Sequence, residues 1–229
     1  MNIKILHLIE GARAARGLTV VIDVFRAFSV ACYAFDRGAE RIIPVGDIDI
    51  AYALKKAHPE YILIGERNER KAIGFDFGNS PTHILHENFT GKTLVHTTSA
   101  GTQGLVNAMN ADEVLTGSFV NADAIIRYIQ NSCPSEVSLV CMGYSAQYPV
   151  EEDTYCAEYI KNKLEDKEID FQSMKQKIKS GSGKRFFEDQ KQDFAPSTDF
   201  ELCLELNRFN FIIRLYKEFG NVYLKRIRF

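Results

Sequence analysis

The sequence predicts an α/β fold with three layers, in which a mostly parallel sheet lies between helices. Short apolar runs alternate with helical segments along most of the chain, and this alternation is typical of such a fold. The run Leu18–Ile22 (LTVVI) is rich in β-branched residues, as expected of a strand buried on both faces. The chain has 229 residues, 45% of them hydrophobic. This length suits a single domain over residues 1–229, with room for a smaller lobe within residues 165–229.

The alternation places the elements in order. Strands are expected at residues 18–22, 41–45, 61–64, 93–96, 113–115 and 137–141. Helices are expected at residues 27–37, 48–57, 122–130 and 152–164, with another from about residue 102. Such a sheet binds ligands in the crevice beyond the carboxyl ends of its strands. A residue that directly follows a strand is therefore the first candidate for chemistry.

The last third of the chain changes character. Residues 161–192 are polar and rich in lysine, with acids between the lysines and SGSG at residues 180–183, which favours a solvated helix pair joined by a turn. Apolar residues return at 200–211, where a C-terminal helix is expected. Segments 211–216 and 222–227 flank Phe219-Gly220-Asn221, and this pattern favours a closing hairpin.

Composition narrows the classes of function and partner. The formal net charge is -2, which argues against nucleic acid or an anionic membrane as a partner. No apolar stretch reaches the length of a membrane span, and the N-terminal segment lacks the pattern of a signal peptide. Five widely spaced cysteines without a CxxC pair indicate free thiols in the cytoplasm rather than disulfides or zinc. A homodimer is expected only because dimers are the commonest oligomers among soluble proteins.

Two predicted strands end in an acid followed by an arginine. Asp23 ends the first strand and Arg26 follows it, while Glu66 and Arg67 follow the strand at residues 61–64. A carboxylate at this position can bind a hard cation, and a guanidinium group can hold phosphate or carboxylate through two hydrogen bonds. The structural alternative is a helix N-terminal acid with a surface arginine for the first pair, and a charged loop for the second. The repetition of the pattern favours an anion-binding catalytic site.

Two loops offer further polar groups. The segment GFDFGNSP contains Asp76 between two aromatic residues, followed by Asn79 and Ser80, and it is also compatible with a purely structural turn. The segment HTTSAGTQG follows a predicted strand and opens a helix, so its backbone N–H groups and hydroxyls could hold an anion. Its candidate residues are Thr97, Thr98, Ser99, Gly101 and Thr102. The alternative for this segment is an ordinary capped helix.

Acids also begin the helix expected at residues 152–164. Glu152 and Asp153 lie in its first turn, shortly after the strand at residues 137–141. Acids in this position often only complement the helix dipole, but they could also bind a metal ion. Asp153 is therefore a candidate ligand alongside Asp23 and Glu66.

Several long motifs together resemble the 2-phosphosulfolactate phosphatase family. They are VIDVFRAFS, GERNERKAIGFDFGNSP, HTTSAGTQG, GSFVNADAI, EEDT and DFELCLELNRFNF, and they extend from about residue 20 to residue 211. The resemblance implies a three-layer α/β/α fold and Mg²⁺-dependent hydrolysis of the phosphate monoester of a small sulfonated hydroxy acid, a step towards coenzyme M. The partner it implies is a small anionic phosphorylated substrate.

The resemblance marks particular residues as functional. They are Asp23, Arg26, Glu66, Arg67, Asp76, Asn79, Ser80, Thr97, Thr98, Gly101 and Thr102. The chain departs from the family pattern in two places. Ser99-Ala100 stands where the family often has asparagine before Gly-Thr, and Glu69 stands where it commonly has glycine. Both departures leave the exact substrate open.

The expected mechanism places one Mg²⁺ on Asp23 and Glu66, with Asp153 as a further ligand, while arginines hold the phosphoryl group. Asp23 or Asp76 would orient the attacking water. Direct attack by water is favoured over a phospho-aspartate at Asp23, because Phe25 stands where the DxDx(T/V) pattern has its second acid. The alternatives are a phosphatase for another small phosphorylated acid or sugar, and a non-catalytic anion-binding module.

Overall fold

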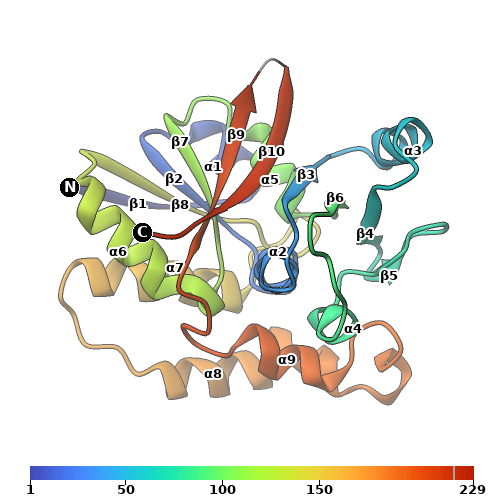
Figure 1. Ribbon diagram of the computed structural model, residues 1–229. Helices are drawn as coiled ribbons and strands as arrows, with labels where there is room; N and C mark the ends of the chain where they lie inside the picture. The colour runs from blue at the N-terminus through green and yellow to red at the C-terminus, as the bar shows by residue number, and fades with distance from the viewer. Residues whose placement is uncertain (219) are drawn as a thin grey trace.

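A single sheet runs through the computed structural model, which describes residues 1–218 and 220–229 (Figure 1). Its ten strands are β1 (Asn2–His7), β2 (Leu18–Ile22), β3 (Arg41–Pro44), β4 (Ile62–Arg67), β5 (Arg70–Lys71), β6 (Thr93–Thr97), β7 (Glu113–Gly117), β8 (Glu136–Cys141), β9 (Ile212–Glu218) and β10 (Asn221–Ile227). They are ordered β1-β8-β2-β7-β9-β10-β3-β6-β4-β5 across the sheet.

Two parallel halves are joined by an antiparallel hairpin. One half contains β1, β8, β2 and β7, and the other contains β3, β6 and β4, all paired in parallel. Between the halves, β9 pairs antiparallel with β7, and β10 pairs antiparallel with β3. The predicted hairpin is confirmed by the pairing of β9 with β10, although Phe219 of its predicted turn lies outside the described residues. Figure 1 shows this hairpin extending beyond the rest of the sheet.

Helices cover both faces of the sheet, which confirms the predicted three layers. The α-helices are α1 (Leu8–Ala14), α2 (Ala27–Asp36), α3 (Ile48–Ala57), α4 (Pro81–Ile84), α5 (Gly101–Asn107), α6 (Ala122–Ser132), α7 (Glu151–Leu164), α8 (Phe171–Ser180) and α9 (Ser197–Cys203). The described residues also form three short 3-10 helices, which are η1 (Phe119–Asn121), η2 (Ser182–Phe187) and η3 (Asp189–Lys191). None of the helices in the described residues has the length and apolar character needed to cross a membrane.

Strand β2 shows how one run of residues supplies both faces. Every residue of β2 is buried. Val21 packs into the apolar cluster beneath α1, α2 and α5, whereas Val20 and Ile22 pack into the cluster beneath α6, α7 and α8. Alternate side chains of a strand point to opposite faces, and full burial of each such side chain is worth roughly 1.5–3 kcal/mol. This central strand is therefore a rigid support for Asp23, which follows it.

The parallel strands bring their carboxyl ends to one edge of the sheet. Segments after β2, β6 and β8, and the last residues of β4, meet there. Strand β4 continues two residues beyond Gly65, to Arg67. Glu66 was expected after the strand but lies inside it. At Gly65 the backbone has a φ of +149°, and an added Cβ would lie 2.0 Å from the carbonyl oxygen of Thr97. The absence of a side chain at Gly65 therefore lets β4 approach β6 closely just before Glu66.

Candidate active site

A small cavity lies at the carboxyl edge of the sheet. It has a volume of about 40 Å³, whereas pockets that hold small molecules usually measure roughly 300–1,000 Å³. The residues that line it come from six separate parts of the chain. They are Asp23, Phe25, Arg26, Glu66, Glu69, Asn79, Thr98, Ser99, Ala100, Gly143, Tyr144, Ser145 and Arg185. The structure thus brings together Asp23, Glu66 and the loop after β6, as the sequence predicted.

Asp23 is the carboxylate at the end of β2. It is only 4% exposed, and its Oδ1 accepts a hydrogen bond of 3.0 Å from the backbone N–H of Ala27 at the start of α2. Burial, reinforced by the nearby charges of Glu66 and Glu152, raises the pKa of Asp23 to about 7. A buried carboxylate with so little compensating positive charge is suited to binding a cation or accepting a proton.

Glu66 connects two loops at the cavity. Its Oε1 accepts a 2.7 Å hydrogen bond from the backbone N–H of Ser99, and its Oε2 accepts one of 2.9 Å from the N–H of Glu69. The Ser99 hydroxyl also donates to Oε2, at 3.3 Å. The side chain is 7% exposed. Glu66 is therefore held in one orientation by both the loop after β6 and the turn between β4 and β5.

The loop after β6 uses its own polar groups internally. The backbone N–H of Thr98 donates to the Thr102 hydroxyl at 3.0 Å, and the N–H of Thr102 donates to the Thr98 hydroxyl at 3.2 Å. The N–H of Ser99 is engaged by Glu66. An added Cβ at Gly101 would lie 2.7 Å from Asp23 Oδ2, so glycine permits the loop to touch that carboxylate. The predicted anion-binding loop thus orients two protein carboxylates in this structure.

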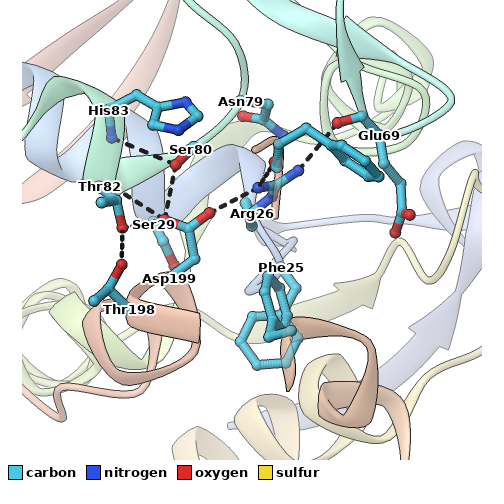
Figure 2. Close-up of polar contacts among 12 residues, drawn as sticks. Phe25, Arg26, Ser29, Glu69, Asn79, Ser80, Thr82, His83, Thr198 and Asp199 are labelled. Atoms are coloured by element: carbon cyan, nitrogen blue, oxygen red, sulfur yellow. Dashed lines mark hydrogen bonds and ion pairs between the residues drawn. The ribbon is translucent and has the colours of Figure 1, made fainter. Parts of the chain in front are cut away.

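Arg26 enters the cavity from the start of α2 and is held by buried acceptors (Figure 2). Its Nη1 donates to Asp199 Oδ2 at 2.7 Å and to the carbonyl oxygen of Phe194 at 2.6 Å, and its Nη2 donates to the carbonyl oxygen of Glu69 at 3.3 Å. The exposed fractions of the Arg26 and Asp199 side chains are 5% and 0%. A guanidinium group has five N–H donors, so two remain beyond these three contacts for an anion in the cavity.

Asp199 of α9 is the residue that fixes Arg26. Its other oxygen, Oδ1, accepts hydrogen bonds from the Ser80 hydroxyl at 2.8 Å, the backbone N–H of Thr82 at 3.0 Å and the Thr82 hydroxyl at 2.6 Å. Figure 2 shows these contacts converging on one carboxylate. The sequence analysis gave Asp199 no functional role. The only local signal was its position in the DFELCLELNRFNF motif.

Arg185 is a second cavity arginine that the sequence analysis missed. It comes from η2, within the lysine-rich segment that was interpreted as a solvated helix pair. Its Nη1 lies 3.1 Å from Glu69 Oε1, and its side chain is 15% exposed. Its guanidinium carbon lies 5.9 Å from the ring centre of Phe25 and 5.4 Å from that of Tyr144. No local pattern distinguished Arg185 from the neighbouring lysines.

The predicted three-carboxylate metal site is not assembled. Asp153 is 2% exposed, but its Oδ1 and Oδ2 each accept a 2.8 Å backbone hydrogen bond, from Val24 and Gly143 respectively, and it does not line the cavity. Burial, and then the charges of Asp23 and Glu152, raise the pKa of Asp153 well above its ordinary value. Within residues 1–218 and 220–229, no three His, Cys, Asp or Glu side chains form a group that could hold a metal ion. Asp153 instead ties the end of β2 to the segment after β8.

The donor set that does face the cavity still suits a hard cation. Asp23 and Glu66 both line it. Burial also raises the pKa of nearby Glu152, an effect opposed by Arg185. Mg²⁺ typically binds through one or two carboxylates, waters and substrate phosphate oxygens. Two oriented carboxylates in an acidic cavity meet that requirement without a third protein ligand.

Several predicted site residues lie elsewhere. Arg67 donates to the Thr97 hydroxyl at 2.8 Å and to the carbonyl oxygen of Glu66 at 2.7 Å, outside the cavity lining. Asp76 accepts from the backbone N–H of Leu63 at 2.8 Å, and its side chain is 39% exposed. Ser80, Thr97, Gly101 and Thr102 also support the site from outside its lining. The short-range pattern placed these residues near strand ends but could not tell which way each side chain points.

Asn79 is the one residue of the GFDFGNSP segment that reaches the cavity. Its Oδ1 lies 3.3 Å from Nε2 of His96, which is 1% exposed. Burial lowers the pKa of His96 to about 4, so the imidazole is neutral near pH 7 and can donate from Nε2 to the Asn79 oxygen. His96 therefore orients Asn79.

Comparisons with known proteins identify relatives across nearly the whole chain. The family model described as 2-phosphosulpholactate phosphatase matches residues 3–218. A probable 2-phosphosulfolactate phosphatase of Bacillus subtilis (strain 168) is 32% identical over 211 residues, covering 91% of each chain. One of Clostridium perfringens (strain SM101 / Type A) is 32% identical over 225 residues, covering 92% of this chain and 89% of the relative. One of Caldicellulosiruptor saccharolyticus is 40% identical over 144 residues, 61% of this chain and 59% of the relative.

The family match spans all the segments that meet at the cavity, from β2 through η2 to α9. Two of these relatives, those of Bacillus subtilis and Clostridium perfringens, share about a third of their residues with the chain across nearly their full lengths. This protein therefore belongs to the 2-phosphosulfolactate phosphatase family.

Proposed function

We propose that this protein hydrolyses the phosphate monoester of a small 2-phospho-hydroxy acid, converting 2-phosphosulfolactate to sulfolactate and inorganic phosphate. Its family is one of phosphoric monoester hydrolases. The observation that carries the proposal is the meeting of Asp23, Glu66 and Arg26 on one cavity, each supplied by a different segment. A phosphoryl group carries negative charge that needs both a cation and hydrogen-bond donors for transfer.

Asp23 and Glu66 would hold one Mg²⁺, with waters completing its coordination. The bound ion would neutralise charge on the transferring phosphoryl group. The orientation of Glu66 by the N–H groups of Ser99 and Glu69 supports this role, because groups that hold a ligand's carboxylate in place tune the metal site.

Arg26 binds the phosphoryl oxygens with its remaining N–H donors. Because Asp199 and the carbonyl oxygens of Phe194 and Glu69 fix the guanidinium group, it is preorganised and needs little reorientation during reaction. In the step itself, the oxygen of a water molecule forms a bond to phosphorus as the bond from phosphorus to the substrate's C2 oxygen breaks. The leaving oxygen takes up a proton from solvent and ends as the hydroxyl of the product acid.

Asp23 is the carboxylate placed to orient the attacking water and take up its proton. It lines the cavity at the end of the buried strand β2. Asp76, the other candidate for this role, lies outside the cavity lining and is bound to Leu63 N–H. The structure thus supports Asp23 over Asp76 as the base.

The test is release of inorganic phosphate by the purified protein from 2-phosphosulfolactate, 2-phospholactate, 2-phosphoglycerate and a sugar phosphate, each with MgCl₂ or with EDTA. We expect Mg²⁺-dependent turnover with a preference for 2-phosphosulfolactate. Asp23→Asn should fold with an unchanged circular dichroism spectrum and lose at least about a hundredfold in kcat/KM. A preference for another phosphate ester would reassign the substrate, and no release from any ester with any divalent metal would overturn the proposal.

A further inference from the structure

The cavity is too small for the proposed substrate as it stands. Its volume of about 40 Å³ is far below the roughly 300–1,000 Å³ of pockets that usually hold small molecules. Glu69 and Arg185 both line it, and their side chains form an ion pair of 3.1 Å. The pair joins the turn between β4 and β5 to η2. Opening of the Glu69–Arg185 ion pair would therefore enlarge the cavity for a three-carbon phosphorylated acid.

Glu69 offers its carboxylate from a backbone that is itself fixed by the site. Its N–H donates to Glu66 Oε2 at 2.9 Å, and its carbonyl oxygen accepts from Arg26 Nη2 at 3.3 Å. Its φ is +66°, and Asn68 before it has a φ of +54°. Non-glycine residues seldom adopt this left-handed conformation. The turn thus presents the side chain of Glu69 to the cavity while its backbone remains attached to Glu66 and Arg26.

Arg185 has binding capacity that Glu69 does not use. Its Nε is buried and has no hydrogen-bond partner among the described residues. Its Nη2 makes only a long contact of 3.4 Å with the carbonyl oxygen of Phe25. A buried N–H without a partner costs free energy, and an arginine fork is shaped to bind a planar or tripodal oxyanion through two hydrogen bonds. The Glu69 carboxylate satisfies this fork incompletely.

The two cavity arginines line the same cavity and share one aromatic neighbour. Their guanidinium carbons both lie against the ring of Phe186, at 5.8 Å from its centre for Arg26 and 5.2 Å for Arg185. Only Arg26 is held by a fully buried carboxylate, that of Asp199. The partner of Arg185 has an exposed fraction of 18%, so its carboxylate can turn towards solvent when another anion arrives.

We propose that Arg185 binds an anionic group of the substrate other than the transferred phosphate, a carboxylate or a sulfonate, and that Glu69 is a built-in competitor which this group displaces. The inference rests on the proposed function for the identity of the substrate. It makes Glu69 and Arg185 the residues that determine specificity for acids carrying a second negative charge. A phosphate ester without that charge leaves the ion pair closed.

The test measures binding without turnover, by isothermal titration calorimetry with sulfolactate and, separately, with inorganic phosphate. Arg185→Gln should weaken sulfolactate binding about tenfold or more, as expected for loss of a charged hydrogen-bonding partner. The affinity of this variant for phosphate should stay within about twofold of the wild-type value, because Arg26 binds that group. Lactate and 2-hydroxyethanesulfonate serve as additional probes. Loss of affinity for either one supports the proposal and tells whether the carboxylate or the sulfonate contacts Arg185.

Glu69→Gln provides the second variant, because it removes the competing charge and keeps Arg185. Sulfolactate should bind this variant more tightly, by up to about fivefold, which is the strength of an ion pair near a surface. Lys191, which pairs with Glu188 on the same segment away from the cavity, supplies Lys191→Gln as a control that should bind as wild type. Equal changes in sulfolactate and phosphate affinity, or no change in either variant, would overturn the inference. So would failure of sulfolactate to bind the wild-type protein.

Failure of this inference can be distinguished from failure of the proposed function. Phosphate release from 2-phosphosulfolactate decides the proposed function and needs no variant of Arg185. The titrations decide the inference and need no turnover. A wild-type enzyme that releases phosphate while Arg185→Gln binds sulfolactate normally would keep the function and remove Arg185 from substrate binding.

Discussion

Arg26 and Arg185 line the same cavity, but the surroundings that hold them differ. Arg26 donates to a fully buried carboxylate and to two carbonyl oxygens. Arg185 pairs with Glu69, which lies at a turn, and keeps a buried Nε without a partner within the described chain. The first arrangement favours a fixed geometry, as needed for stabilising charge during reaction. The second favours exchange of one anion for another, as needed for binding and release.

The largest expected effect comes from breaking the fixed arrangement. Arg26→Gln leaves Asp199 buried without its positive partner, which typically costs about 3–5 kcal/mol of unfolding free energy. It should also lower kcat/KM at least about a hundredfold. Urea denaturation and phosphate release measure the two effects. The matched change Arg185→Gln should alter the unfolding free energy by only about 1 kcal/mol. Equal losses of stability in the two variants would erase the distinction between the arginines.

Asp199→Asn tests whether the fixed geometry depends on the charge of Asp199. The amide keeps the shape but replaces one acceptor oxygen with a donor, opposite either Arg26 or the Ser80 and Thr82 donors. We expect kcat/KM to fall about tenfold and the unfolding free energy to fall by roughly 1–3 kcal/mol. Glu201→Gln on the same helix is the control, because Glu201 is exposed and its ion pair is with Lys175, away from Arg26. A wild-type value of kcat for Asp199→Asn would show that Arg26 needs no charged partner.

The raised pKa of Asp23 predicts a smaller, pH-dependent effect. Its folded-state pKa of about 7 exceeds the ordinary value of 3.8 for an aspartate, so the folded state binds more protons than the unfolded state between these pH values. Stability without metal should therefore fall as pH rises through that interval. Mg²⁺ should stabilise the protein increasingly over the same interval, because its ligands must be deprotonated.

Thermal unfolding with MgCl₂ or EDTA, recorded at several pH values, measures both trends. Asp23→Asn should remove most of the pH dependence and most of the stabilisation by Mg²⁺. The pKa of Asp23, about 7, lies between pH 5 and pH 8. Equal stabilisation by Mg²⁺ at these two pH values would therefore argue against Asp23 as a ligand.

The smallest expected effect is that of Arg67→Lys. The guanidinium group of Arg67 contacts Thr97, Gly46 and the backbone of Glu66 outside the cavity lining. A lysine can reach part of the same set, so kcat/KM should change by no more than about threefold, within the range of a modest hydrogen bond. Steady-state kinetics on the leading substrate tests this. A loss as large as that of Arg26→Gln would place a third arginine in the reaction.

Most of the strands, most of the helices and one half of the site could be predicted from the sequence alone. A continuously buried strand such as β2 has a recognisable composition, and the acid that follows a parallel strand lies at the ligand-binding edge of the sheet. Asp23 and Glu66 were found in this way. The N-terminal strand β1 was missed, and the hairpin of β9 and β10 was expected only as an ending, whereas it joins the two parallel halves.

Only the tertiary structure decided which polar groups face the cavity. Arg26 and Asp199 are 173 residues apart in the chain, and Arg185 comes from a segment whose local composition indicated a solvated surface. The same structure turns the oxygens of Asp153 towards backbone N–H groups and directs Arg67 away from the cavity. The physical reason is that periodicity and turn chemistry are local, whereas the direction of a polar side chain depends on which donors and acceptors distant segments bring to it.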